Sequence, residues 1–319
     1  MPNVQEPPIL VTGGAGFIGT HLCHALLGQN KSVRVLDLKL PDQPVPRVDY
    51  RQGDIRNPRD LMLATHGVQA VFHFAAIVSV PLCQEDLVTG YATNLTGTLN
   101  VLEAVRVEKT RSGRSPKLIF ASSAAVYGNA LEIGRATTED MAGPAPQSFY
   151  GAQKLASEQA IQIAHQVYGV PSVIFRFFNV FGKGQDPSSP YSGVISVFKN
   201  ALEAGRPLLL NGGGTQTRDF ISVHDVVLAC IKALDLPKDQ YSALPINLGT
   251  GQSTTILQLA DSMIRASGRK VATQSMPPRE GDLQHSLSDT SRAREILNWT
   301  AQTQLDNGLA DLLSLAKDA

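Results

Sequence analysis

Short apolar runs alternate along the chain with longer segments in which apolar residues recur at helical spacing. Strands are expected at residues 9–11, 33–36, 70–74, 117–121 and 173–177. Helices are expected at residues 21–27, 94–107 and 150–168. Strands that alternate with helices are typical of a parallel sheet with helices on both faces. The pattern therefore predicts an α/β fold with a doubly wound parallel sheet.

The pattern changes beyond residue 178. Segments rich in glycine, proline and serine cover residues 182–190 and 211–214, with one helix expected between them at 194–204. Loop-rich sequence of this kind indicates a second and smaller part of the molecule.

Two domains follow from these patterns. We expect a Rossmann domain at residues 1–178 and a smaller, discontinuous α/β lobe at residues 179–219 and 249–319. The segment 220–248 contains apolar runs at 220–223 and 245–248. We expect both runs to form strands that return the chain to the main sheet.

A glycine-rich turn joins the first predicted strand to the first helix. The turn contains Gly13, Gly16 and Gly19. Glycine lets backbone NH groups and a helix N-terminus approach a pyrophosphate closely. The next strand ends at Asp37, whose carboxylate can accept hydrogen bonds from a ribose diol and would repel a ribose phosphate. The turn therefore predicts a dinucleotide site that prefers NAD to NADP, although Arg34 and Lys39 nearby weaken that preference.

A second acidic residue, Asp54, ends another predicted strand in the sequence Gly-Asp-Ile-Arg. Its carboxylate could hold the edge of an adenine ring. It could equally form a turn after the glycine. The sequence leaves both interpretations open.

Tyr150 and Lys154 are four residues apart on a predicted helix, so their side chains face the same side. We expect the ammonium to lower the pKa of Tyr150 below its ordinary value of about 10, which would make the phenol a base for a hydroxyl proton. Ser123 follows a predicted strand at the carboxyl edge of the sheet, where ligands collect, and could share that proton. Local hydrogen bonding within a loop is the other interpretation of Ser122 and Ser123.

Charge and composition exclude several classes of function. The 319 residues contain 28 basic and 28 acidic side chains, so no excess field attracts a nucleic acid. No apolar run approaches the roughly 18 residues of a membrane span, and no secretory signal is visible. Cys23, Cys83 and Cys230 fit neither a disulfide framework nor a metal site. We expect a cytoplasmic protein with reduced thiols, no metal, no nucleic-acid partner and no membrane contact.

These motifs and several others resemble the extended short-chain dehydrogenase/reductases, the family of NAD-dependent epimerases and dehydratases. The matching segments are residues 12–19, 37, 53–55, 73–76, 94, 122–128, 150–154, 177–182, 185–193, 216–220 and 279–282. Within this family the chain is most similar to the UDP-glucose and UDP-N-acetylglucosamine 4-epimerases. The resemblance covers nearly the whole chain and implies NAD as cofactor and a UDP-sugar as substrate.

The resemblance also implies roles for individual residues. The catalytic residues would be Ser123, Tyr150 and Lys154. The cofactor would contact Gly13, Gly16, Phe17, Ile18, Gly19, Asp37, Asp54, Ile55, Phe74, Ala75, Ala76, Asn94, Ser122, Tyr150 and Lys154. The substrate would contact Ser79, Ser123, Tyr150, Asn179, Arg218, Arg279, Asp282 and Ser286. Two of these are arginines, which are always charged and can bind diphosphate oxygens in pairs. A surface ion pair is the other interpretation of Arg279.

The implied reaction is epimerisation at C4 of a UDP-hexose through a transient 4-keto sugar. In the family, a bulky residue at the position of Ser286 accompanies restriction to glucose and galactose. This small residue therefore predicts room for an acetamido group. We expect UDP-N-acetylglucosamine, UDP-glucose and their galacto epimers as substrates. Helices 94–107 and 150–168 resemble those that pair in homodimers of the family, although their apolar faces could equally belong to the core.

Two other functions stay open at the level of sequence. A dehydratase acting on UDP-N-acetylglucosamine would use the same oxidation at C4 and then eliminate water. Relatives with 4,6-dehydratase activity carry a Thr-Asp-Glu run where this chain has Ser123, Ala124 and Ala125, although Cys83 could move a proton in a less usual dehydratase. A non-catalytic NAD-binding regulator would have lost the serine, the tyrosine or the lysine, and all three are present.

Overall fold

The computed structural model describes residues 6–128, 135–141, 144–185, 193–279 and 283–314. The chain divides into two compact units. The first unit is made of Met1–Val126, Pro146–Arg176 and Val227–Ile246. The second is made of Tyr127–Ala145, Phe177–Val226 and Asn247–Ala319. The second unit therefore takes residues 127–145, which the sequence analysis placed with the first domain.

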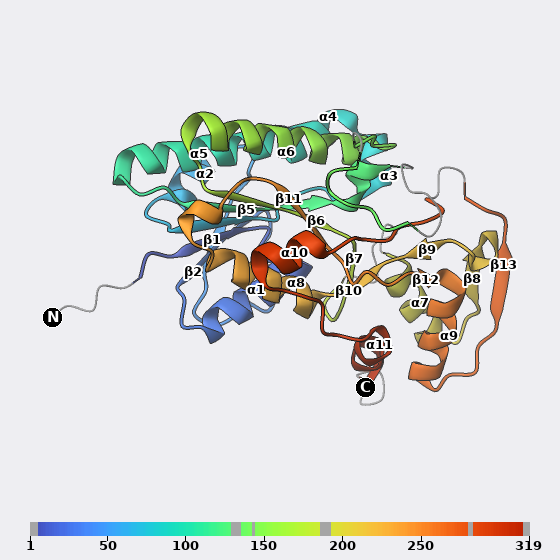
Figure 1. The fold of residues 1–319 in the computed structure, drawn as a ribbon. Helices are drawn as coiled ribbons and strands as arrows, with labels where there is room; N and C mark the ends of the chain where they lie inside the picture. The colour runs from blue at the N-terminus through green and yellow to red at the C-terminus, as the bar shows by residue number, and fades with distance from the viewer. Residues whose placement is uncertain (1–5, 129–134, 142–143, 186–192, 280–282, 315–319) are drawn as a thin grey trace. The chain divides into compact units, whose positions relative to one another are not determined.

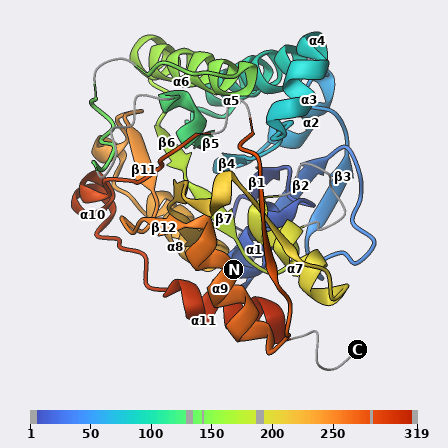
Figure 2. The same cartoon turned by 90° about the vertical axis from the view of Figure 1, so that its right-hand side faces the viewer.

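A seven-stranded sheet forms the centre of the first unit (Figure 1). Its strands are β1 (Ile9–Thr12), β2 (Val33–Asp37), β3 (Asp49–Gln52), β4 (Ala70–His73), β5 (Lys117–Ser123), β6 (Ser172–Phe177) and β11 (Pro245–Leu248). Their order is β11-β6-β5-β4-β1-β2-β3, which Figure 2 shows from β3 at the right to β11 at the left. Strand β1 pairs in parallel with both β2 and β4. The winding direction reverses at this strand, which is the point where α/β sheets bind ligands.

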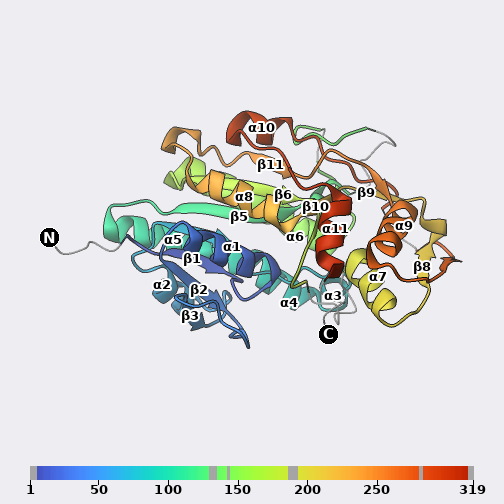
Figure 3. The same ribbon diagram turned by 90° about the horizontal axis from the view of Figure 1, so that it is seen from below.

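Helices cover both faces of this sheet (Figures 1 and 3). One face carries α2 (Pro58–Thr65), α5 (Gly97–Ser112) and α6 (Phe149–Tyr168), and the other carries α1 (Phe17–Gly28) and α8 (Val223–Leu234). Short helices α3 (Val80–Glu85) and α4 (Leu87–Tyr91) lead through a π-helical turn, η1 (Ala92–Thr96), into α5. The core beneath α2, α5 and α6 includes Leu10, Phe120 and Ile161, all essentially inaccessible to solvent. The predicted doubly wound α/β fold is confirmed.

The second unit is built from strand pairs and helices around its own core. Its strands are β7 (Asn179–Phe181), β8 (Leu208–Asn211), β9 (Thr217–Arg218), β10 (Phe220–Ser222), β12 (Thr254–Thr255) and β13 (Thr273–Met276). Its helices include α7 (Val194–Glu203), α9 (Ile256–Ser267), α10 (Ser291–Leu297) and α11 (Leu305–Ser314). Figure 1 shows α7 and α9 beside β8 and β13, and the buried side chains between them include Phe198, Leu210 and Leu259.

One of the two strands expected to return to the main sheet does so. Strand β11 lies at the edge of the seven-stranded sheet, beside β6, as predicted. Strand β10 instead pairs with β7, with Phe220 opposite Asn179, so the prediction for residues 220–223 was wrong. The strand is short because α8 begins at Val223, and its backbone groups find their partners on β7.

No helix in the described part of the chain is both long enough and apolar enough to span a lipid bilayer.

Candidate active site

The turn between β1 and α1 has a backbone geometry that requires glycine at two positions. Gly13 has a φ of 72°, and a Cβ there would lie 2.6 Å from the backbone nitrogen of Ala75. A Cβ at Gly19 would lie 2.3 Å from the carbonyl oxygen of Gly13. Both collisions are with backbone atoms, so no side-chain movement can relieve them. With glycine at both positions, the ends of β1 and β4 and the start of α1 can approach one another closely. Any residue with a Cβ at these positions would force them apart.

The first turn of α1 follows this loop. Gly16 is the N-cap residue of the helix, and no side chain caps it. The predicted cofactor residues Phe17 and Ile18 begin the helix and are half-buried. A helix N-terminus with free backbone NH groups favours an anion such as a pyrophosphate. These features fit a dinucleotide phosphate.

Asp37 ends β2 beside the same turn. Its Oδ2 accepts a hydrogen bond from the backbone NH of Ala15 at 3.0 Å, and its Oδ1 accepts one from the backbone NH of Lys39 at 3.4 Å. A carboxylate has about four acceptor positions, so further donors can bind. The side chain therefore fits the predicted contact with a ribose diol.

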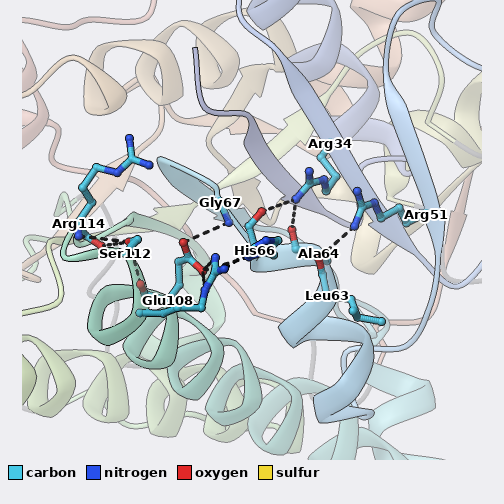
Figure 4. A network of polar contacts seen from close by, with 10 residues as sticks. Arg34, Arg51, Leu63, Ala64, His66, Gly67, Glu108, Ser112 and Arg114 are labelled. Carbon is cyan, nitrogen blue, oxygen red and sulfur yellow. Dashed lines mark hydrogen bonds and ion pairs between the residues drawn. The ribbon is translucent and has the colours of Figure 1, made fainter. Parts of the chain in front are cut away.

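Arg34 does not face this carboxylate but the end of helix α2 (Figure 4). Its Nε donates to Asp49 at 2.9 Å, and its Nη1 donates to the carbonyl oxygens of Ala64 at 2.7 Å and His66 at 2.9 Å. Arg51 donates to another carbonyl at the same helix end. Carbonyl oxygens at a helix C-terminus carry partial negative charge and attract cations. Arg34 is thus engaged with Asp49 and α2, and the expectation that Arg34 and Lys39 weaken the preference for NAD stays a prediction.

The carboxylate of Asp54 is engaged locally. It accepts hydrogen bonds from the backbone NH and from the Nε of Arg56, both at 2.8 Å. These bonds hold the pKa of Asp54 below its ordinary value. Its neighbour Ile55 is buried and packs against Gly97 of α5. The geometry favours the turn interpretation of Asp54, and its contact with adenine stays a prediction.

The segment after β4 passes close to the glycine turn. The predicted cofactor residues Phe74, Ala75 and Ala76 are half-buried there. Before them, the buried His73 forms hydrogen bonds with Thr12 through Nδ1 at 2.8 Å and with Thr98 through Nε2 at 3.0 Å. Burial, assisted by the charge of Lys154, lowers the pKa of His73 to about 3. The neutral imidazole ties β4 to β1 and α5.

Two further predicted cofactor residues have structural partners. The buried amide of Asn94 accepts from the backbone NH of Ile77 at 2.8 Å and donates to its carbonyl oxygen at 2.9 Å and to Oε1 of Gln153 at 2.7 Å. The hydroxyl of Ser122 donates to Oε1 of Glu158. Asn94 thereby fixes the segment after β4, and Ser122 fixes the end of β5. Their contacts with a cofactor stay predictions.

Ser123, Tyr150 and Lys154 are brought together at the carboxyl end of β5. Helix α6 begins at Phe149 because Ser148 caps it, accepting a hydrogen bond from the backbone NH of Gly151 at 3.1 Å. This places Tyr150 in the first turn, where Ser123 acts to lower the pKa of its phenol. The Ser123 hydroxyl oxygen also accepts a hydrogen bond from the backbone NH of Ala125 at 3.1 Å. Lys154 lies one turn further, with Nζ 5.8 Å from the centre of the Tyr150 ring.

The ammonium of Lys154 is also bound to the end of β5. Its Nζ donates to the carbonyl oxygen of Ala121 at 2.8 Å and lies 4.8 Å from the centre of the Phe120 ring. The side chain is only 3% exposed. Strand and helix are therefore joined at the residues predicted to carry the chemistry.

Burial decides the pKa values of this pair. It raises the pKa of Tyr150 to about 12, although the hydrogen bond from Ser123 acts in the opposite direction. It lowers the pKa of Lys154 to about 8, against the opposing effects of Glu158 and Cys83. The expected lowering of the tyrosine pKa is thus reversed, because loss of solvent outweighs the effect of Ser123. The phenol in this environment is a proton donor until a further positive charge acts on it.

Ser79 and Cys83 belong to helix α3. The hydroxyl of Ser79 caps the helix by accepting from the backbone NH of Leu82 at 3.1 Å, and the residue is buried. The thiol of Cys83 is also buried, and burial raises its pKa. A thiol that stays protonated cannot accept a proton, which speaks against Cys83 as the base of a dehydratase but not against it as an acid.

The predicted nucleotide-binding residues belong to the second unit. Asn179 is exposed on β7, Arg218 is half-buried on β9, and Arg279 is exposed. Ser286 is small and buried. Asp282 lies outside the described residues. The structure therefore places three of the four residues predicted for the nucleotide, and Ser286, predicted for the sugar; their contacts with a substrate stay predictions.

Sequence reasoning gave no role to two buried carboxylates near predicted site residues, Glu158 and Asp219. Glu158 stands one helical turn after Lys154 and pairs with Arg176, with 2.6 Å between Oε2 and Nη2. Asp219 follows Arg218 directly and accepts hydrogen bonds from the backbone NH and hydroxyl of Thr250 at 2.8 and 2.6 Å. The spacing of four from Lys154 could have pointed to Glu158. No local signal marks Asp219, because its partners are distant in sequence.

Comparison with known proteins decides the family. A family model described as the NAD dependent epimerase/dehydratase family matches residues 9–249. The chain belongs to this family. The NAD-dependent epimerase/dehydratase family consists of enzymes that use NAD, so the predicted recognition and cofactor are confirmed. The glycine turn and Asp37 fit that cofactor on the geometry given above.

Individual relatives differ in the sugar that they are named for. The UDP-glucose 4-epimerase of Mycolicibacterium smegmatis is 34% identical, covering 94% of this chain and 96% of its own. The UDP-N-acetylglucosamine 4-epimerase of Methanobrevibacter ruminantium, solved with UDP-N-acetylmuramic acid, has a TM-score of 0.87 at 29% identity, with 98% of each chain covered. A variant of the UDP-glucuronic acid 4-epimerase of Bacillus cereus, solved with NAD, has a TM-score of 0.85 at 29% identity, covering 97% of this chain and 99% of its own. Similarity to UDP-sugar 4-epimerases thus extends over essentially the whole chain.

Proposed function

We propose that this chain interconverts the C4 epimers of a UDP-hexose through a transient 4-keto sugar. The observation that carries the proposal is the cluster at the end of β5, where Ser123 acts on the pKa of the Tyr150 phenol and the Nζ of Lys154 lies 5.8 Å from the centre of the same ring. Such a cluster can move one proton to and from a sugar hydroxyl. Membership of the family supports the reaction class.

Each residue of the cluster has a distinct task in this proposal. Tyr150 takes the proton of the sugar 4-hydroxyl and returns it after inversion. Ser123 holds the phenolic oxygen and shares the proton. Burial alone disfavours the phenolate, and Lys154 together with the positive charge of the bound NAD ring would favour it electrostatically. Bound NAD would supply the reversible two-electron oxidation at C4. The glycine turn and Asp37 would hold the NAD.

We propose further that the second unit supplies the nucleotide-binding residues, with Arg218 and Arg279 binding the diphosphate and Asn179 and Asp282 the remainder of the UDP group. Guanidinium groups suit this role because they bind phosphate oxygens in pairs. Ser286 supports an acetamido sugar, since a small side chain leaves space beside C2. We therefore propose UDP-N-acetylglucosamine, UDP-glucose and their galacto epimers as substrates.

Incubation with a panel of UDP-sugars tests the reaction. The panel contains UDP-glucose, UDP-N-acetylglucosamine, UDP-glucuronic acid and the galacto form of each, and products are identified by chromatography and mass. We expect products of unchanged mass with inverted C4. A product one water lighter would establish the dehydratase instead, and no turnover with bound NAD would establish the non-catalytic regulator.

Tyr150→Phe tests the assignment of the base. The variant should lose at least three orders of magnitude in kcat while it still binds NAD, because only the phenolic oxygen is removed. Tyr168→Phe on the same helix is the matched control, since Tyr168 is 52% exposed at the far end of α6. Full turnover by Tyr150→Phe would refute the assignment.

Ser286→Tyr tests the sugar specificity. The larger side chain should abolish turnover of UDP-N-acetylglucosamine and leave turnover of UDP-glucose, which also shows that the variant folds. Equal loss with both sugars would count against the role of Ser286.

We also propose a homodimer in the cytoplasm. Leu99 on α5 and Ile163 and Val167 on α6 are large apolar side chains that are 45, 58 and 65% exposed, and apolar side chains exposed together can mark an interface between proteins. Light scattering tests the assembly, and Ile163→Lys should shift it toward the monomer. A wild-type mass of one chain would refute the dimer.

A further inference from the structure

We propose that Glu158 is a positioning residue for the reaction: it fixes the end of β5 that carries Ser123 and maintains the positive charge of Lys154. The inference rests on the proposed roles of Tyr150, Ser123 and Lys154. It adds a carboxylate that touches neither substrate nor cofactor in the proposed reaction.

The geometry of α6 supports the first part. Tyr150, Lys154 and Glu158 follow one another at intervals of four and face the same side of the helix. Their exposed fractions are 8, 3 and 1%. The Glu158 carboxylate accepts a hydrogen bond from the hydroxyl of Ser122, the residue before Ser123. The Nζ of Lys154 donates a hydrogen bond to the carbonyl oxygen of Ala121 at 2.8 Å. Two consecutive residues of β5 are thus tied to two consecutive turns of α6.

The partner of Glu158 on the next strand makes this connection rigid. Arg176 of β6 donates through Nε to Oε1 at 3.0 Å and through Nη2 to Oε2 at 2.6 Å. Both side chains of this ion pair are at most 4% exposed. A carboxylate held by two donors of one guanidinium has a fixed orientation. Glu158 therefore presents its Oε1 to Ser122 in one position.

The charges around Lys154 support the second part. Besides Glu158 and the carbonyl oxygen of Ala121, four groups in the described residues contact or act on the ammonium: His73 from β4, Cys83 from α3, and the rings of Phe120 from β5 and Tyr150 from α6. Burial keeps the imidazole neutral by lowering its pKa, and keeps the thiol and phenol neutral by raising theirs. The carboxylate that opposes the loss of the ammonium charge is that of Glu158.

Stability alone gives little reason for a charged pair at this place. Removing two ions from water costs several kcal/mol, and well-packed apolar residues often stabilise a core as much or more. A positioning role explains the arrangement, because an apolar replacement could neither accept from Ser122 nor act on Lys154. The two interpretations differ in what happens to the charge of Lys154.

Titration of Lys154 in the NAD-bound protein separates these interpretations. Lysine labelled with carbon-13 at Cε reports the charge of the ammonium, and the Lys154 signal is assigned by its absence in Lys154→Met. We expect Glu158→Gln to lower the pKa of Lys154 by at least about half a pH unit. Glu158→Asp, which keeps the charge, should stay closer to wild type. Glu203→Gln is the matched control, because Glu203 also pairs with a cation, Lys199 of α7, but lies at the surface.

The double variant Glu158→Gln, Arg176→Met is used where loss of the ion pair destabilises the single variant. It should lower the pKa of Lys154 in the same direction. The alkaline limb of kcat should move to lower pH in both variants, because the ammonium is lost earlier. An unchanged pKa of Lys154 in both variants, or an equal fall in Glu203→Gln, would overturn the inference. A wild-type protein that converts no UDP-sugar would refute the proposed function, and the titration would still decide the role of Glu158.

Discussion

Lys154→Met should make the fold more stable at neutral pH while it abolishes turnover. In the native chain the ammonium is held almost out of contact with water, and its pKa falls from 10.5 to about 8. Methionine fills a similar volume without a charge. The substitution therefore removes a group whose charged form the fold disfavours.

The difference of roughly 2.5 pH units corresponds to about 3 kcal/mol of unfavourable free energy. This cost is complete below pH 8, where folded and unfolded chains both carry the ammonium. It decreases as the pH rises, since the folded chain then releases its proton first, and it vanishes above pH 10.5, where both states are neutral. Loss of the hydrogen bond to Ala121 opposes the gain by about 1–3 kcal/mol at low pH. The pH dependence is therefore a sharper measure than the stability at one pH.

Urea unfolding followed by circular dichroism between pH 7 and pH 10.5 measures this effect. Wild type should gain about 3 kcal/mol relative to Lys154→Met across that range. Groups that titrate in both proteins cancel from the difference. Lys199→Met, on the surface of α7, should show no such trend. A difference in unfolding free energy between wild type and Lys154→Met that stays constant with pH would refute the reasoning.

Three other predictions follow from the geometry. Gly19→Ala should weaken NAD binding at least about tenfold by calorimetry, because its Cβ would lie 2.3 Å from a backbone oxygen, whereas Gly28→Ala, with open space around it, should bind as wild type does. His73→Gln should reduce the loss of stability between pH 6.5 and pH 4 by about 3 kcal/mol in urea unfolding, since the fold keeps this imidazole neutral with a pKa of about 3; an identical acid dependence would contradict it. Asp219→Asn should lose about 2–4 kcal/mol of stability and bind UDP at least about tenfold more weakly with unchanged affinity for NAD, because the carboxylate aligns the segment that carries Arg218; unchanged UDP binding would contradict this role.

Local patterns were sufficient to predict the main sheet. Apolar runs and helical spacing place β1, β2, β4, β5 and β6 within one or two residues of their observed bounds. The run at residues 220–223 was assigned to the wrong sheet, because an apolar sequence does not indicate which strand it pairs with. Its pairing with β7 is decided by the contacts of the second unit.

In the candidate site too, features set by neighbouring residues in the sequence were predicted, and features set by residues distant in the sequence were not. The spacing of Tyr150 and Lys154 on one helix predicted that their side chains lie close together, and Ser148 fixes where that helix begins. The direction of the pKa shift of Tyr150 could not be predicted, because it depends on burial by residues from several elements. Glu158 was overlooked for a related reason, since its partners, Ser122 and Arg176, come from two strands.

The bond from the backbone NH of Ala15 to Asp37 has a consequence for redesign of the cofactor preference. In the proposed cofactor site, conversion to an NADP enzyme would begin with the removal of this carboxylate, because it would repel a phosphate on the ribose. The same change would release the backbone of the phosphate-binding loop, and Arg34 could not compensate while it remains bound to α2. The preference for NAD and the geometry of the glycine turn therefore both depend on Asp37. A redesign would have to change the charge at this position and also replace the hydrogen bond to Ala15.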